Sequence, residues 1–141
     1  MKIVIITGSA PPEPICAGRV HWDMAKYLAE EGHETWLISP FPSRPLGTKY
    51  NNPERNRVVQ PLKNFYHVNI KSYTYPKYNL WYRSYESIDF GTKSIRYVNK
   101  RIKEYDVIYA SPWAFLGQMM IVLLRRNKKA PLIMNVQDLY P

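Results

Sequence analysis

Residues 1–39, MKIVIITGSAPPEPICAGRVHWDMAKYLAEEGHETWLIS, decide the fold class. The run KIVIIT (2–7) is apolar on both faces, which is typical of a buried central strand in a parallel sheet. A helical pattern follows from Gly18 and ends at Gly32, a natural C-terminal stop. This pattern places on one side Val20, Met24, Tyr27 and Leu28. TWLIS (35–39) then predicts a second strand, so the stretch forms a βαβ unit.

The remainder of the chain repeats this alternation. Three further strands are predicted at residues 65–73, 106–110 and 131–136. Helical spacing recurs between them, over residues 88–102 and 113–127. Residues 40–56 are dense in Pro, Asn and Gly and read as a loop, whereas residues 74–85 fit no pattern. The alternation predicts one α/β domain over residues 1–141, with a doubly wound, mostly parallel Rossmann-like sheet.

The composition limits the classes of partner that the chain could bind, but it does not identify one. The chain has 141 residues, 45% of them hydrophobic, and a net charge of +9. Such an excess favours an anionic partner: a nucleotide, a phosphorylated lipid, a membrane surface or a nucleic acid. A single cysteine allows no internal disulfide, which fits a reducing compartment. We find no signal peptide and no apolar run of roughly 20 residues, so we expect a cytoplasmic protein that can touch a membrane surface.

In a parallel sheet, ligands bind beyond the carboxyl ends of the strands. Four segments are expected there: residues 8–18, 40–44, 111–113 and 135–141. The first is longer than the roughly 2–6 residues of a bare connector. Ala17 and Gly18 are small residues at a helix start and Arg19 adds a cation, so this loop could hold a phosphate. Alternatively it is an ordinary connector, stiffened by its prolines.

Three stretches resemble a known family. AGRVHWDMAKYLAEEGHETWLISPFPS (17–43), VIYASPW (107–113) and NVQDLYP (135–141) are similar to the N-terminal part of family 4 glycosyltransferases with the GT-B fold. The most similar members are bacterial enzymes that build capsule, O-antigen or related surface polysaccharides. The resemblance covers nearly the whole chain and is best over residues 10–43 and 131–141.

The resemblance implies a sugar transferase that retains anomeric configuration and needs neither metal nor cofactor. Its N-terminal domain binds the acceptor, and its C-terminal domain binds the nucleotide sugar. Nothing in residues 1–141 matches the C-terminal domain. The chain is therefore expected to be an acceptor-side domain, inactive alone, that serves a saccharide or polyprenyl-linked acceptor.

A second class of function stays open beside the transferase. The net charge of +9 also fits a stand-alone module that binds a nucleotide, a nucleic acid or a membrane surface without catalysis. The basic residues do not form an RRM, KH or helix-turn-helix pattern, so nucleic acid is not the partner that we expect.

The resemblance also assigns candidate site residues. The donor phosphate is expected near Cys16, Ala17, Gly18 and Arg19, where relatives carry a run of glycines and this chain keeps only Gly18. Asp138 is the candidate catalytic residue, with a helix cap as its alternative role. Candidate acceptor-binding residues are His21, Ser111 and Trp113. His21 is alternatively a partly exposed helical histidine, and Trp113 alternatively packs beneath a helix.

A basic stripe follows one side of the predicted helix over residues 88–102. It consists of Lys93, Arg96, Lys100 and Lys103, whereas the sheet-facing side carries Ile88, Gly91, Ile95, Val98 and Ile102. Together with the aromatic and basic residues 63–83, this stripe suits an anionic membrane surface. The alternative is a solvated helix face.

Overall fold

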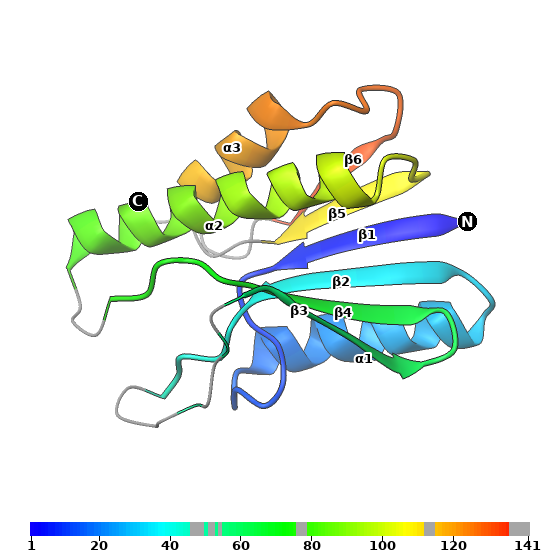
Figure 1. Ribbon diagram of the computed structural model, residues 1–141, viewed down its shortest axis with the longest axis horizontal. Helices are drawn as coiled ribbons and strands as arrows, with labels where there is room; N and C mark the ends of the chain where they lie inside the picture. The colour runs from blue at the N-terminus through cyan, green and yellow to red at the C-terminus, as the bar shows by residue number, and fades with distance from the viewer. Residues whose placement is uncertain (46–49, 51–52, 54, 76–78, 112–114, 136–141) are drawn as a thin grey trace.

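The structure is a computed structural model of residues 1–141, and it describes all of them except 46–49, 51–52, 54, 76–78, 112–114 and 136–141. Figure 1 shows the elements. The strands are β1 (Lys2–Thr7), β2 (Glu34–Pro40), β3 (Arg57–Leu62), β4 (Phe65–Ile70), β5 (Val107–Ser111) and β6 (Leu132–Met134). The helices are α1 (Cys16–Glu30), α2 (Leu80–Arg101) and α3 (Phe115–Leu124).

The strands form one six-stranded sheet in the order β3-β4-β2-β1-β5-β6. The five predicted strands are β1, β2, β4, β5 and β6, and their pairings are all parallel. β3 is the exception, because it pairs antiparallel with β4 at the edge of the sheet. The prediction of a mostly parallel sheet is therefore confirmed.

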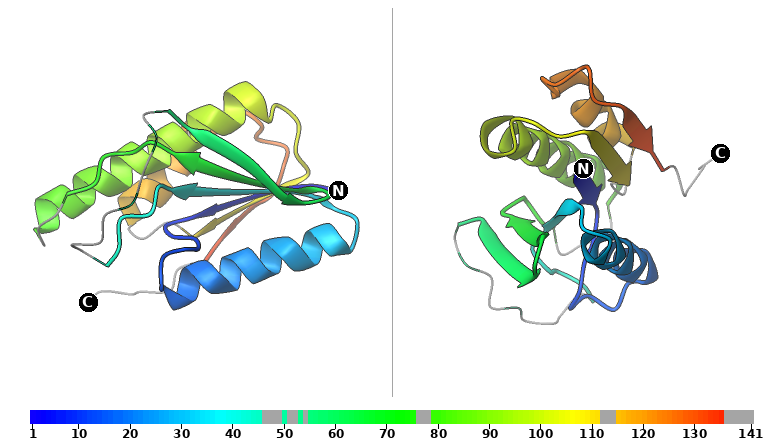
Figure 2. Two further views of the ribbon diagram at one scale, coloured as in Figure 1. Left: turned by 60° about the horizontal axis from the view of Figure 1, so that its bottom comes forward. Right: turned by 90° about the vertical axis from the view of Figure 1, so that its right-hand side faces the viewer.

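Helices cover both faces of the sheet, as a doubly wound fold requires (Figure 2). Side chains of β1 alternate between the two layers: Val4 and Ile6 belong to the core under α2 and α3, and Ile3 and Ile5 to the core under α1. Burying each such side chain stabilises the fold by about 1.5–3 kcal/mol. These two cores fix the sheet between its helices and align the carboxyl ends of five strands at one edge.

The inner face of α1 differs from the predicted one. Val20 and Tyr27, which we expected on one side with Met24 and Leu28, are 56% and 62% exposed. The buried residues of this helix are Gly18, His21, Ala25 and Ala29. Small residues dominate this face, so the helix backbone can approach the sheet closely. The helix ends as predicted, since Gly32 has a φ of 87°, a conformation that favours glycine.

Helix α2 begins earlier than predicted, and its start accounts for residues 80–85 of the unassigned stretch. The side chain of Asn79 caps it by accepting a hydrogen bond from the Trp81 backbone N–H at 3.0 Å. The ring of Tyr82 stacks on that of Tyr75, with centroids 3.7 Å apart. The predicted inner side is confirmed from Gly91 to Ile102, and the basic stripe faces solvent.

Helices α2 and α3 cross at very close range. A Cβ at Gly91 would lie 2.5 Å from the carbonyl oxygen of Gly117, so only glycine fits there. The Ser87 hydroxyl of α2 accepts a hydrogen bond at 2.9 Å from the backbone N–H of Gly117, which lies in the first turn of α3. Helix α2 thereby caps its neighbour.

Candidate functional site

The candidate site lies at the carboxyl edge of the parallel strands. In the sheet, β2 and β4 lie on one side of β1, and β5 and β6 lie on the other side. The crevice of such a sheet is expected where the order reverses, here between β1 and β5. The Gly8 backbone N–H donates to the Ser111 carbonyl oxygen at 3.3 Å, so the first loop and the end of β5 meet at this point.

A buried carboxylate joins the first loop to the segment after β2. Glu13 is 6% exposed, and its Oε1 accepts hydrogen bonds from the backbone N–H of Ser43 (2.5 Å) and of Arg44 (2.8 Å). The Ser43 hydroxyl lies 3.4 Å from the same oxygen. Two of the four predicted segments, residues 8–18 and 40–44, are therefore held together. Sequence reasoning missed Glu13, although a charged residue among prolines was a visible signal.

A cavity of about 100 Å³ opens beside this contact, and we call it the rim cavity. It is lined by Gly8, Glu13, Pro40, Ser43, Arg44, Ser72, Tyr73, Thr74, Arg83, Glu86, Ser87 and Phe90. Its residues come from the ends of β1, β2 and β4 and from the first turns of α2.

An ion pair lines the rim cavity. Arg44 Nη2 lies 4.0 Å from Glu86 Oε2, and both side chains are only 14% exposed. The other oxygen of Glu86 accepts a hydrogen bond from the Tyr75 backbone N–H. Two guanidinium groups, two carboxylates and the aromatic rings of Tyr73 and Phe90 thus surround one small space. Such a lining can donate to and accept from hydroxyl groups and can cover an apolar ring face.

In the predicted phosphate loop, Gly18 and Arg19 contact other residues of the chain. Gly18 is buried, and a Cβ there would lie 2.6 Å from Ser9 Oγ and 2.9 Å from the Ser9 carbonyl carbon. Its lack of a side chain therefore lets α1 pack against the first loop. Arg19 is bound to Asp23, with Nε and Oδ2 3.0 Å apart. Cys16 is exposed, and Ala17 is half-buried.

His21 is not the partly exposed histidine of the alternative reading. It is 1% exposed, and its Nδ1 lies 2.9 Å from Thr7 Oγ1. The Thr7 hydroxyl donates to the Ser9 carbonyl oxygen at 3.1 Å, so we assign the proton of this contact to Nδ1. Nε2 is buried and has no hydrogen-bond partner among the described residues. Burial lowers the pKa of His21, and a hydrogen bond with the Ala17 backbone offsets part of this shift. Through its contact with Thr7, the ring connects α1 to the end of β1.

His67 of β4 belongs to a second buried polar cluster. Its Nε2 lies 2.9 Å from Ser39 Oγ, and the Asn69 amide donates to the same oxygen at 3.2 Å. Burial, and secondarily the charge of Arg57, lowers the pKa of His67 to about 4. The cluster links β2 to β4 beneath the edge of the sheet.

The other predicted acceptor and catalytic residues are only partly placed. Ser111 ends β5 and is 8% exposed, beside Gly8. Trp113 and Asp138 lie outside the described residues. Asn135 is the last described residue before Asp138, and its backbone N–H bonds to the Ala110 carbonyl oxygen at 3.0 Å. Asn135 therefore lies next to the end of β5, whereas the other residues of the predicted segment 135–141 lie outside the described residues.

Neither a metal-ligand cluster nor a membrane-spanning helix is found in the part of the chain that the structure describes. No group of three or more His, Cys, Asp or Glu residues in this part of the chain could hold a metal ion. None of the described helices combines the length and apolar character needed to cross a bilayer.

Comparison with known proteins supports the fold. No family model and no curated protein matches the sequence. Among solved structures, the chain is similar to the catalytic domain of starch synthase IV from Arabidopsis thaliana bound to ADP and acarbose, with a TM-score of 0.58 and 15% identity. The match covers 85% of this chain and 29% of that one, so this chain spans less than a third of its length. Starch synthase is a glycosyltransferase of the GT-B fold, and the predicted fold class is confirmed.

Proposed function

We propose that the chain is the acceptor-side domain of a glycosyltransferase, with the acceptor saccharide bound in the rim cavity. The observation that carries this proposal is the lining of that cavity, where Arg83, Arg44 and Glu86 lie with two aromatic rings at the carboxyl edge of a GT-B-like sheet. Sugar hydroxyls pair well with guanidinium and carboxylate groups, and an aromatic ring covers the C–H face of a pyranose. The bound ADP and acarbose of the starch synthase structure are consistent with such partners.

The sequence resemblance supports the more specific part of the proposal, which concerns the mechanism, the family and the acceptor. It indicates a retaining enzyme of family 4 that transfers a sugar from a nucleotide sugar to a saccharide or polyprenyl-linked acceptor in bacterial surface-polysaccharide synthesis. The N-terminus of α1 remains our proposed contact for the donor phosphate, with Cys16, Ala17 and Gly18 at the helix start. Asp138 remains the proposed catalytic residue. A second domain would supply the remaining nucleotide contacts.

Saturation-transfer NMR on the chain tests this proposal, with a panel of short oligosaccharides and nucleotide sugars as ligands. We expect at least one saccharide to bind, and we expect Arg83→Ala to weaken its binding at least roughly tenfold, the effect of one lost hydrogen bond to a charged group. Arg96→Ala removes the same side chain from the outer face of α2 and is expected to leave binding unchanged. Binding of nucleotide sugars but of no saccharide would refute the acceptor-side assignment.

A further inference from the structure

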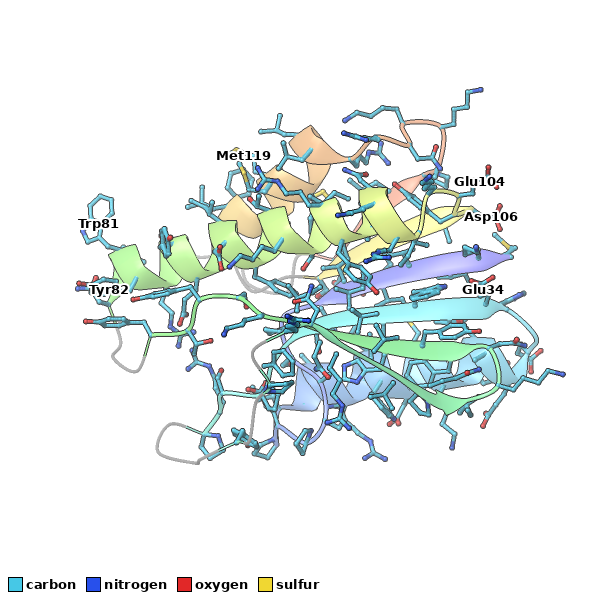
Figure 3. The ribbon with its side chains drawn as sticks, viewed as in Figure 1. Glu34, Trp81, Tyr82, Glu104, Asp106 and Met119 are labelled. Carbon is cyan, nitrogen blue, oxygen red and sulfur yellow. The ribbon has the colours of Figure 1, made fainter. Side chains whose placement is uncertain are left out.

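Helix α2 carries two kinds of exposed side chain. At its start, Leu80, Trp81, Tyr82 and Tyr85 are 81%, 83%, 39% and 56% exposed, and we call these four residues the aromatic tip. Figure 3 shows Trp81 and Tyr82 directed away from the body of the molecule at this end of the helix. Further along the helix, Lys93, Arg96 and Lys100 are exposed.

A basic groove lies beside the second part of this helix. Its volume is about 740 Å³, and it separates α2 from the edge of the sheet at β3 and β4. Six cations line it: Arg55, Lys71, Lys93, Arg96, Lys100 and Arg101. None of the described residues that line it is acidic. Lys93 is bound to Asp89, 2.8 Å away, which offsets one positive charge and leaves a strong excess.

From these two features we propose that α2 docks flat on an anionic lipid bilayer. The aromatic tip would enter the boundary between headgroups and acyl chains, and the basic groove would lie against lipid phosphates. Trp81 and Lys100 are separated by about 30 Å along the helix at 1.5 Å per residue, so a helix docked flat would contact the bilayer over this length. Exposed aromatic rings and clustered cations on one helix face are the two elements of interfacial membrane binding.

The tip distinguishes a bilayer from a nucleic acid, the other polyanion that the cations could attract. An exposed Trp could stack on a base, but the aliphatic side chain of Leu80 gains nothing from a charged polynucleotide. A bilayer interface buries both side chains. The docking does not depend on sugar transfer. It would, however, bring the rim cavity close to the membrane, because Arg83 and Glu86 arise from the same turns of α2.

Vesicle co-sedimentation tests the docking. We expect the chain to bind vesicles of phosphatidylcholine with phosphatidylglycerol, to bind phosphatidylcholine alone weakly, and to lose affinity as salt rises. The double variant Arg96→Glu with Lys100→Glu should lower the partition coefficient at least roughly tenfold, since each cation near an anionic surface contributes to binding. Lys128→Glu with Lys129→Glu is the matched control: either pair of reversals takes the net charge from +9 to +5.

Tryptophan emission supplies a second readout. Vesicles should shift the emission to the blue, and Trp81→Phe should remove this shift while leaving the other three tryptophans in place. Leu80→Ser should weaken vesicle binding without changing the melting temperature, because this side chain is exposed. The proposal is overturned if binding is equal in the stripe variant and its control, if Trp81 emission does not shift, or if single-stranded DNA displaces the vesicles.

Discussion

Acidification should destabilise the chain through His67. Its imidazole is 6% exposed and bound to Ser39, and its pKa is lowered to about 4 in the folded state. In the unfolded chain a histidine has a pKa of about 6.5. Below pH ~6.5 the histidine is therefore protonated in the unfolded state but still neutral in the folded state. The free energy of unfolding consequently falls as the pH falls towards 4. Below the folded pKa this loss levels off.

The magnitude follows from the two pKa values. Between pH 7 and pH 4.5 one such histidine removes roughly 2 kcal/mol from the free energy of unfolding. Urea titrations of the chain at both pH values measure this loss. In His67→Gln, which retains a polar side chain, the loss should be about 2 kcal/mol smaller than in the native chain. His21, whose pKa is also lowered, adds acid sensitivity that persists in this variant.

An NMR titration of the His67 ring protons checks the cause directly. The ring should remain neutral well below pH 6 in the folded chain. A midpoint near 6.5, or an undiminished acid loss in His67→Gln, would refute the reasoning.

Three other substitutions test the contacts around the site. Gly18→Ala should cost about 1–3 kcal/mol, because its Cβ would overlap the backbone of Ser9; an unchanged urea midpoint would contradict this packing. Ser87→Ala should cost about 1–2 kcal/mol by removing the acceptor of the buried Gly117 N–H, and should speed hydrogen exchange at that amide. Glu13→Ala should cost about 1–3 kcal/mol and speed exchange of the two backbone amides that Glu13 binds; unchanged protection would exclude the carboxylate as their partner.

The five parallel strands were predictable because their signals are local. Most of them are short apolar runs flanked by turn residues, which is typical of parallel strands, whereas β4 carries His67 and Asn69 among its apolar residues. β3 was missed for the opposite reason. None of its residues is buried, and Pro61 interrupts it, so burial imposed no pattern on its sequence. The remaining signal was Asn64, whose φ of 65° makes the tight turn into β4.

The edge of the sheet where the candidate site lies could be predicted from the sequence, whereas several of the side chains gathered there could not. Carboxyl ends of parallel strands share an edge, so the meeting of residues 8–18 with 40–44 followed from the topology. Arg83 and Glu86 were missed because the start of α2 has no apolar period: Leu80, Trp81 and Tyr82 are exposed. The burial of His21 was missed because the inner face of α1 is built largely from small residues, which a search for large apolar side chains overlooks.

The central claim is that the carboxyl edge of the sheet binds a saccharide. Amide chemical-shift mapping of the chain with a saccharide that binds tests this claim directly. We predict shifts clustered at Gly8, Ser43, Arg83 and Glu86, around the rim cavity. A cluster at the opposite edge of the sheet, marked by Glu34, Glu104 and Asp106 in Figure 3, would contradict the claim.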